Sequence, residues 1–154
     1  MTTKEFIENY EGVKDKDKFL AECIVKQYIP YEEKMTYCEN IIEKTTHKNI
    51  ADKEVYWRNT PVQYMVFSLT LVDLYSDVNI DFKNILKEFN ALDEIGGIDA
   101  LISFIPNTEY AKFKTILNMV SDDNYENLRS ISSWLDTKFD AINLLLDGIS
   151  QVSE

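Results

Sequence analysis

The sequence predicts an all-α fold, a single compact bundle of about six to eight helices around a central apolar helix near residues 60–76, with a long C-terminal helix. Only three prolines and four glycines punctuate the 154 residues, too few for the frequent turns of a sandwich or barrel. Apolar residues recur at intervals of three and four along most of the chain. The length and the 45% hydrophobic content fit one domain, residues 1–154.

Two short helices are predicted at the N-terminal end. Thr2 and Glu5 have the spacing of a capping box, and Gly12 is placed to end the helix that follows. Either Asp15 or Asp17 then caps a second helix with a single apolar stripe.

A third helix follows without a long loop. Pro30 is expected to end the second helix, and the third runs from Tyr31 to about Lys44 because its apolar residues repeat every three or four positions. Periodicity is lost over residues 45–59, so we expect an irregular connection there, with room for a short extended piece at Glu54–Trp57. This connection lies within the domain.

The central helix has the clearest start in the chain. Thr60 is predicted as its N-cap, Pro61 occupies the first helical position, and Gln63 is placed to reach back to the cap. The helix is expected to end near Tyr75. Apolar residues cover most of its circumference, which predicts packing on several sides; they are Val62, Met65, Val66, Phe67, Leu69, Leu71, Val72 and Leu74.

Three further helices are predicted before the C-terminal segment. Asp81 caps the first, and the Gly96–Gly97 pair breaks it. A short helix over Ile98–Ile105 ends at a proline, and Asn107 or Thr108 caps a longer one. The apolar positions of the first of these helices follow the i, i+3, i+4, i+7 rule; they are Phe82, Ile85, Leu86, Phe89 and Leu92.

The C-terminal segment carries a heptad-like pattern, which we call the seam. Its positions alternate in steps of three and four, with one charged break: Leu128, Ile131, Leu135, Lys138, Ile142, Leu145 and Ile149. Two interpretations stay open, a helix docked on its own domain and an interface with a partner or a second copy. Leu135 and Ile142 are the seam residues that we single out as candidate contacts.

Aromatic residues supply the other candidate contacts. Tyr and Trp have one apolar and one polar end and are enriched in protein interfaces. Tyr56, Trp57 and Arg58 are adjacent in the predicted connection, and Trp134 stands close to Asp136 in the C-terminal segment. The competing interpretation places each of them partly in the core.

The residues offer little for catalysis, and we expect no enzyme and no cofactor. His47 is the single histidine, and it stands in a polar run without a nucleophile motif. Cys23 and Cys38 are not spaced for a zinc site or a redox pair. No phosphate-binding glycine motif or metalloprotease motif is present.

One segment imitates a calcium loop. Oxygen-bearing side chains occupy positions 1, 3, 5 and 12 of an EF-hand pattern over residues 77–88. Position 6 needs a left-handed residue, normally glycine, but here it is Phe82, which belongs to an apolar helical stripe. We therefore predict an Asp-capped helix and no metal site.

The charge restricts the partners. With 16 basic and 27 acidic side chains the net charge is −11, which argues against direct contact with nucleic acid or an anionic membrane. Most of this charge is expected to be solvated surface. A face of carboxylates that imitates DNA phosphates is the alternative that we keep.

Three blocks resemble a known group of proteins. They are YIPYEEKMTYCENII at residues 28–42, YWRNTPVQYMVFSLTLVDLY at 56–75 and EFNALDEIGGIDALISFIPNTEYAKFKTILNMVSDDNYEN at 88–127. Together they look like small acidic helical proteins of tailed phages and prophages of low-GC Gram-positive bacteria, which are encoded near virion-assembly genes.

The resemblance implies a non-enzymatic virion structural or assembly protein of the head, neck or tail. Its partners would be other phage structural proteins or a second copy of itself. Its location would be the host cytoplasm during infection, or the virion. The alternative is an acidic phage inhibitor of a host defence or DNA-binding protein, similar in kind to an anti-CRISPR protein, and its partner would be that host protein.

Overall fold

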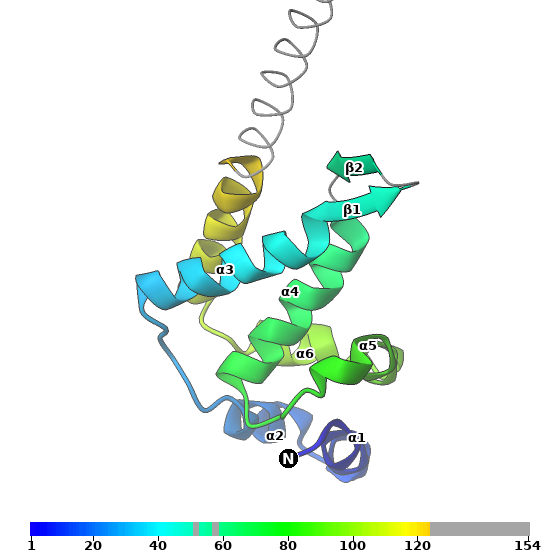
Figure 1. The fold of residues 1–154 in the computed structure, drawn as a ribbon. Coiled ribbons are helices and arrows are strands. Elements are labelled where there is room, and N and C mark those ends of the chain that lie inside the picture. Colours follow the sequence, from blue (N-terminus) through cyan, green and yellow to red (C-terminus); the bar gives the residue numbers. More distant parts are fainter. Residues whose placement is uncertain (51–52, 57–58, 124–154) are drawn as a thin grey trace, which may run out of the picture.

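Helices form most of the chain in the computed structural model, which describes residues 1–50, 53–56 and 59–123, with the backbone alone for 47–50 and 53–56 (Figure 1). The elements are α1 (Thr3–Gly12), α2 (Lys16–Cys23), α3 (Tyr31–Thr46), α4 (Thr60–Tyr75), the 3₁₀-helix η1 (Phe82–Asn84), α5 (Ile85–Glu94) and α6 (Gly97–Ser103). A further helix covers residues 107–123. The prediction of an all-α bundle of six to eight helices is confirmed.

A small β-hairpin lies between α3 and α4. Strands β1 (His47–Ile50) and β2 (Lys53–Tyr56) pair antiparallel, with His47 opposite Tyr56. The predicted irregular connection over residues 45–59 is therefore largely ordered, because its first two residues belong to α3 and the next ones form this hairpin. The predicted seam lies outside the described residues.

Local capping explains where α1 and α2 begin. The Thr2 hydroxyl accepts a hydrogen bond from the Glu5 N–H at 3.2 Å, and the Thr2 N–H donates to the Glu5 carboxylate at 2.6 Å. The predicted capping box is confirmed. Of the two aspartates considered for α2, Asp15 is the cap, and its carboxylate accepts from the Lys18 N–H at 3.1 Å.

The second helix is shorter than predicted. It ends at Cys23, seven residues before Pro30. The backbone N–H groups of Val25 and Lys26 both donate to the carbonyl of Tyr75, at 2.8 and 3.2 Å. Since these bonds take the chain to the end of α4, a contact distant in sequence overrides the local apolar pattern.

Helix α4 lies at the centre of the bundle, as predicted (Figure 1). It packs against α3, α5 and α6. Its cap is Asn59 rather than Thr60, because the Asn59 side chain accepts from the Val62 N–H at 3.2 Å. Gln63 therefore does not complete a capping box, and its side-chain oxygen is buried without a hydrogen-bond partner among the described residues. The buried residues of α4 are Phe67, Ser68, Leu69, Thr70, Leu71, Val72 and Tyr75.

The second half of the described chain follows the predicted breaks with small shifts. Asp81 caps η1, a single 3₁₀ turn that leads into α5. Gly96 has φ 67°, a left-handed conformation that glycine adopts without strain, and it separates α5 from α6. The next helix already includes Asn107 and starts directly after Pro106, so neither Asn107 nor Thr108 is its cap.

The helix of residues 107–123 covers one side of the crossing pair formed by α3 and α4. Phe113 is fully buried, and its ring centroid lies 5.7 Å from that of Phe67 and 6.4 Å from that of Tyr75. The Cys38 thiol donates to the Phe113 carbonyl at 3.8 Å. Within the described ranges, the helices fall short of the length and apolar character that a bilayer-spanning segment needs.

Candidate functional site

The interaction residues chosen from sequence fall almost entirely outside the described side chains. Tyr56 is placed in β2 by its backbone alone. The others lie outside the described residues: Trp57, Arg58, Trp134, Leu135 and Ile142. Their roles as contacts therefore stay predictions, and the described residues point to two other features.

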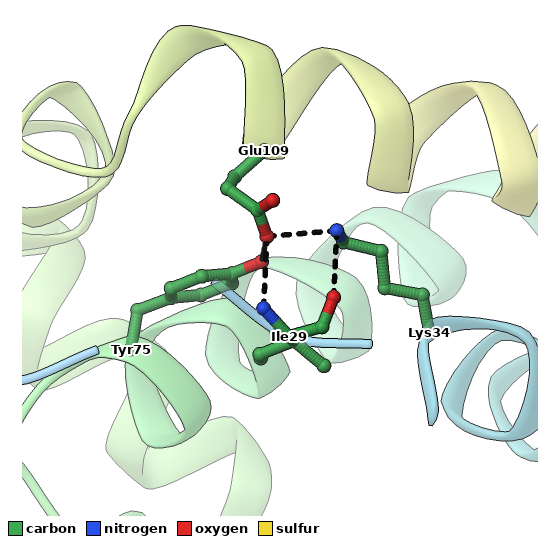
Figure 2. A network of polar contacts seen from close by, with 4 residues as sticks. All are labelled: Ile29, Lys34, Tyr75 and Glu109. Atoms are coloured by element: carbon green, nitrogen blue, oxygen red, sulfur yellow. Dashed lines mark hydrogen bonds and ion pairs between the residues drawn. The ribbon is translucent and has the colours of Figure 1, made fainter. Parts of the chain in front are cut away.

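The first feature is a buried polar cluster that joins four segments of the bundle, which we call the Glu109 cluster. It consists of Ile29 in the connection before α3, Lys34 on α3, Tyr75 at the end of α4, and Glu109 on the helix of residues 107–123 (Figure 2). The Lys34 side chain is 0% exposed, and Glu109 is buried. A lysine is almost never buried so completely unless it is paired.

One carboxylate oxygen organises the cluster. Glu109 Oε2 lies 2.8 Å from Lys34 Nζ, accepts from the Tyr75 hydroxyl at 2.6 Å, and accepts from the Ile29 N–H at 3.2 Å. Lys34 Nζ also donates to the Ile29 carbonyl at 2.9 Å (Figure 2). Both buried charges therefore have several partners, which is the condition for a buried ion pair to be tolerated.

Hydrogen bonds decide the charge state of the cluster. Burial alone raises the pKa of Glu109, but the hydrogen bonds from Lys34, Tyr75 and the Ile29 N–H outweigh it and hold the pKa below its usual value. Burial, together with the neighbouring Glu109 carboxylate, raises the pKa of Tyr75. Tyr75 therefore stays a hydrogen-bond donor and Glu109 stays ionised at neutral pH.

The Glu109 cluster is built to hold the helices together. Lys34 Nζ is engaged by the Glu109 carboxylate at 2.8 Å and by the Ile29 carbonyl at 2.9 Å, so it is not aimed at an open site. The cavities considered below are lined by neither Lys34 nor Glu109. The geometry of the Glu109 cluster fits a structural role, in which it links α3, α4 and the helix of residues 107–123.

The second feature is an open groove on the other side of the α3–α4 pair, which we call the α3–α4 groove. Its volume is about 280 Å³. Phe82 and Tyr37 stand at its rim and remain 45% and 36% exposed. The residues that line the groove are Tyr37, Asn40, Ile41, Lys44, Val66, Thr70, Asp73, Leu74, Phe82 and Ile85.

Apolar exposure continues beyond the rim of this groove along α5. Leu86 is 61% exposed, one residue after Ile85 in the groove wall. Phe89 follows one helical turn later, and its ring meets the exposed Tyr64 edge-on with centroids 6.2 Å apart. Leu86 and the Tyr64–Phe89 pair therefore add apolar surface on and beside α5, outside the residues that line the groove.

The polar groups of the groove do not form a reactive set. The Asp73 carboxylate accepts from the Ile80 N–H at 2.9 Å, and the Thr70 hydroxyl donates to the Val66 carbonyl at 2.7 Å. Both side chains are therefore already engaged in hydrogen bonds to the backbone of the fold. Lys44 is the single cation among the lining residues, and it forms no ion pair with another described residue.

A second hollow lies between α1 and α5 and has charged walls. Its volume is about 450 Å³. The Thr3 hydroxyl donates to the Glu88 carboxylate across it, and Lys4 pairs with Glu8 at its rim at 3.9 Å. These contacts are exposed or only part-buried, and exposed ion pairs contribute little.

The two thiols are poor nucleophiles in this fold. Burial, with a smaller effect of the Asp77 carboxylate, raises the pKa of Cys23 to about 11. Burial likewise raises the pKa of Cys38 to about 12. With these raised pKa values both thiols are protonated near neutral pH. Since the thiolate is the reactive form, neither is a ready nucleophile. Among the described residues, no group of three or more His, Cys, Asp or Glu side chains is placed to hold a metal ion.

The Glu109 cluster was missed by sequence reasoning, although a signal was present. Lys34 falls on the stripe of α3 that also carries Tyr31 and Cys38, and Glu109 precedes Phe113 by one helical turn. Each is a charge within an apolar stripe, and the two charges have opposite sign. Such a pair predicts a buried ion pair between two helices.

Comparison of the chain with protein families, curated proteins and solved structures found no match.

Proposed function

We propose that this chain is a non-enzymatic structural or assembly protein of a tailed phage, acting through protein–protein contacts at the α3–α4 groove. The observation that carries the proposal is the exposure of Phe82 and Tyr37 at the rim of a largely apolar groove on a helical scaffold. Aromatic and aliphatic residues that anchor an interface typically insert into such a groove. The resemblance of the three sequence blocks to phage proteins supports the phage context.

The opposite side of the α3–α4 pair supports the same proposal. The Glu109 cluster fixes α3, α4 and the helix of residues 107–123 to one another through buried charge-assisted hydrogen bonds. A rigid helix pair presents its groove in one shape, which lowers the cost of ordering on binding.

The first test is quantitative mass spectrometry of density-purified particles from a phage or induced prophage that encodes this chain. A structural protein is expected at a fixed number of copies per particle. The second test complements a disrupted gene with Phe82→Asp. The yield of infectious particles should fall at least tenfold relative to the wild-type gene.

The matched control is Val25→Asp, which adds the same charge at an apolar residue that is 59% exposed and does not line the groove. It should restore the yield. If disruption of the gene leaves the yield of infectious particles unchanged, the chain is not needed for the virion, and the proposal is wrong.

The net charge of −11 favours one alternative, an acidic inhibitor of a host defence or DNA-binding protein. Binding through carboxylates that imitate phosphates would weaken steeply with salt, because counterions compete with the contact. A titration against DNA-binding proteins of the host at low and at high salt tests it. Binding through the α3–α4 groove would instead depend little on salt.

A further inference from the structure

The helix of residues 107–123 lies at the edge of the bundle with one face buried (Figure 1). Its buried residues share one stripe of the helix and are Glu109, Phe113, Ile116, Leu117 and Ser121. The residues on its other faces are exposed or half-buried, whereas α4 packs against three other helices. Elements with fewer buried contacts open locally at a lower free-energy cost than the core does.

The backbone hydrogen bonds change direction where this helix follows α6. The Ile105 N–H donates back to the Ile102 carbonyl at 3.0 Å. The Pro106 carbonyl accepts from the Glu109 and Tyr110 N–H groups, at 2.9 and 3.1 Å. The link between Ile105 and Pro106 therefore joins two separately hydrogen-bonded units. The helix can move about this link and keep its own backbone hydrogen bonds.

The Glu109 cluster makes a partial movement of the helix costly. Lys34 is 0% exposed, and its Nζ lies 2.8 Å from Glu109 Oε2. A small shift that breaks this contact without admitting water leaves two buried charges unpaired, which is strongly unfavourable. A full displacement of the helix brings both charges into water. The helix is therefore either seated, with Glu109 on its partners, or released.

The connection between α2 and α3 is held at two different places. The N–H groups of Val25 and Lys26 donate to the carbonyl of Tyr75, so they are fixed to the backbone of α4. The Ile29 N–H instead donates to Glu109 Oε2 at 3.2 Å (Figure 2). Release of the helix takes the acceptor away from Ile29 and leaves the acceptor of Val25 and Lys26 in place.

The two cysteines fall on either side of the same division. Cys38 on α3 is 0% exposed, and its thiol donates to the Phe113 carbonyl at 3.8 Å. Cys23 at the end of α2 is 2% exposed, and its carbonyl accepts from the Asp77 N–H at 2.9 Å. A thiol reagent reaches either residue only after an opening that exposes it. Release of the helix exposes Cys38 and leaves the contacts of Cys23 intact.

We infer that the helix of residues 107–123 is a hinged cover on the α3–α4 pair, which opens as one unit with Ile29 while α1, α2 and α4 stay folded. Its hinge is the link to α6, and Glu109 is the contact that holds it closed. Opening uncovers Phe67 and Tyr75 of α4, so the covered side becomes a second apolar surface in the open form. This movement does not depend on the contact proposed for the α3–α4 groove.

The test follows the reaction of each cysteine with iodoacetamide in the full-length protein, by mass spectrometry of the two cysteine-containing peptides. The reagent is kept dilute, so that each rate is proportional to the population of the open form. Tyr75→Phe removes the hydroxyl that donates to Glu109 at 2.6 Å in the seated form. Because this bond exists only when the cover is closed, the rate at Cys38 should rise about tenfold.

The matched variant is Phe6→Leu, which changes the core at the far end of the bundle. The Phe6 ring stacks on those of Tyr10 and Phe19, with centroids 5.6 and 5.7 Å apart. These contacts are present in the closed and in the open form of the cover. The variant should therefore lower the urea midpoint of unfolding and raise the rate at Cys23 about tenfold, but leave the rate at Cys38 unchanged.

Hydrogen exchange of single amides, measured by nuclear magnetic resonance, tests where the moving unit ends. The Ile29 amide should follow Cys38, with faster exchange in Tyr75→Phe and unchanged exchange in Phe6→Leu. The Val25 amide, whose acceptor is on α4, should exchange faster in Phe6→Leu. The helical circular dichroism signal checks that each variant is folded, and Phe19→Leu replaces Phe6→Leu if that variant is not.

Three results would overturn the inference. If Phe6→Leu accelerates Cys38 and Cys23 by the same factor, Cys38 is exposed only when the whole chain unfolds. If Tyr75→Phe leaves the rate at Cys38 unchanged, the Glu109 cluster does not hold the cover closed. If the Ile29 amide follows Val25 in both variants, the connection before α3 does not open with the helix.

Discussion

The covered and open sides of the α3–α4 pair contrast in how they treat charge and apolar surface. On the covered side, Lys34 and Glu109 are buried with several hydrogen-bond partners, and Phe113 is fully buried with its ring beside Phe67 and Tyr75 of α4. On the open side, Phe82 and Tyr37 keep more than a third of their surface in solvent. One helix pair thus has a closed side that the polar Glu109 cluster stabilises and an open side with exposed apolar residues.

The difference teaches how the two sides divide their roles. A buried ion pair adds little net stability compared with apolar residues of the same size, but it disfavours arrangements that leave either charge unpaired. The covered side therefore fixes the position of the helix of residues 107–123. The open side contributes less to folding, so its residues are available for contacts with another chain.

The largest loss of stability is expected from breaking the ion pair of the Glu109 cluster. Glu109→Gln leaves the buried Lys34 charge without its counter-ion, which should lower the free energy of unfolding by about 3–5 kcal/mol. Urea unfolding followed by circular dichroism measures it. The matched control is Glu8→Gln, whose partner Lys4 lies 3.9 Å away in an exposed pair, and it should cost less than about 1 kcal/mol.

A double variant tests whether the loss of stability in Glu109→Gln comes from leaving the Lys34 charge unpaired. Lys34→Met combined with Glu109→Leu removes both charges and should recover most of the stability lost in Glu109→Gln, because no buried charge is left alone. If Glu109→Gln costs no more than Glu8→Gln, the covered side does not depend on the ion pair, and the contrast with the open side is wrong.

A smaller change in the free energy of unfolding is expected when the pH is lowered. The folded pKa of Glu109 is below its ordinary value of 4.5, so its contribution to stability is complete above about pH 4.5 and is lost as the pH falls through the folded pKa. The wild type should therefore lose stability below pH 4.5 more steeply than Glu109→Gln. Glu5 and Asp81 also have lowered pKa values, but both proteins retain them, so their effect cancels in the comparison. Parallel pH profiles would contradict the assignment.

Sequence patterns predicted the helices where local signals decide the structure. The capping box at Thr2, the end of α4 at Tyr75 and the break at Gly96 all follow from residue types at fixed offsets. The prediction was wrong where distant backbone groups decide. Helix α2 stops at Cys23 because Val25 and the residue after it bond to the Tyr75 carbonyl, which no local pattern records.

The candidate site was less accessible to sequence reasoning than the fold. Phe82 was assigned to an apolar stripe together with Ile85 and Phe89, but a stripe does not tell how completely a neighbour covers it. In the structure, Phe82 lies in the 3₁₀ turn before α5 and stays half exposed at the groove. Which side of a helix pair remains open depends on the order of packing of all helices, and periodicity does not contain that information.

The smallest effect is expected on the open side, from Phe82→Ala. Phe113→Ala on the covered side removes a fully buried ring and should cost about 3–5 kcal/mol. Phe82 is 45% exposed, so the same substitution should cost about 1 kcal/mol or less in unfolding, while still lowering the yield of infectious particles. Urea unfolding of the two variants, paired with complementation of the disrupted gene by Phe82→Ala, measures both effects. Equal losses of stability would mean that Phe82 supports the fold as Phe113 does, and the groove would then not be an open contact surface.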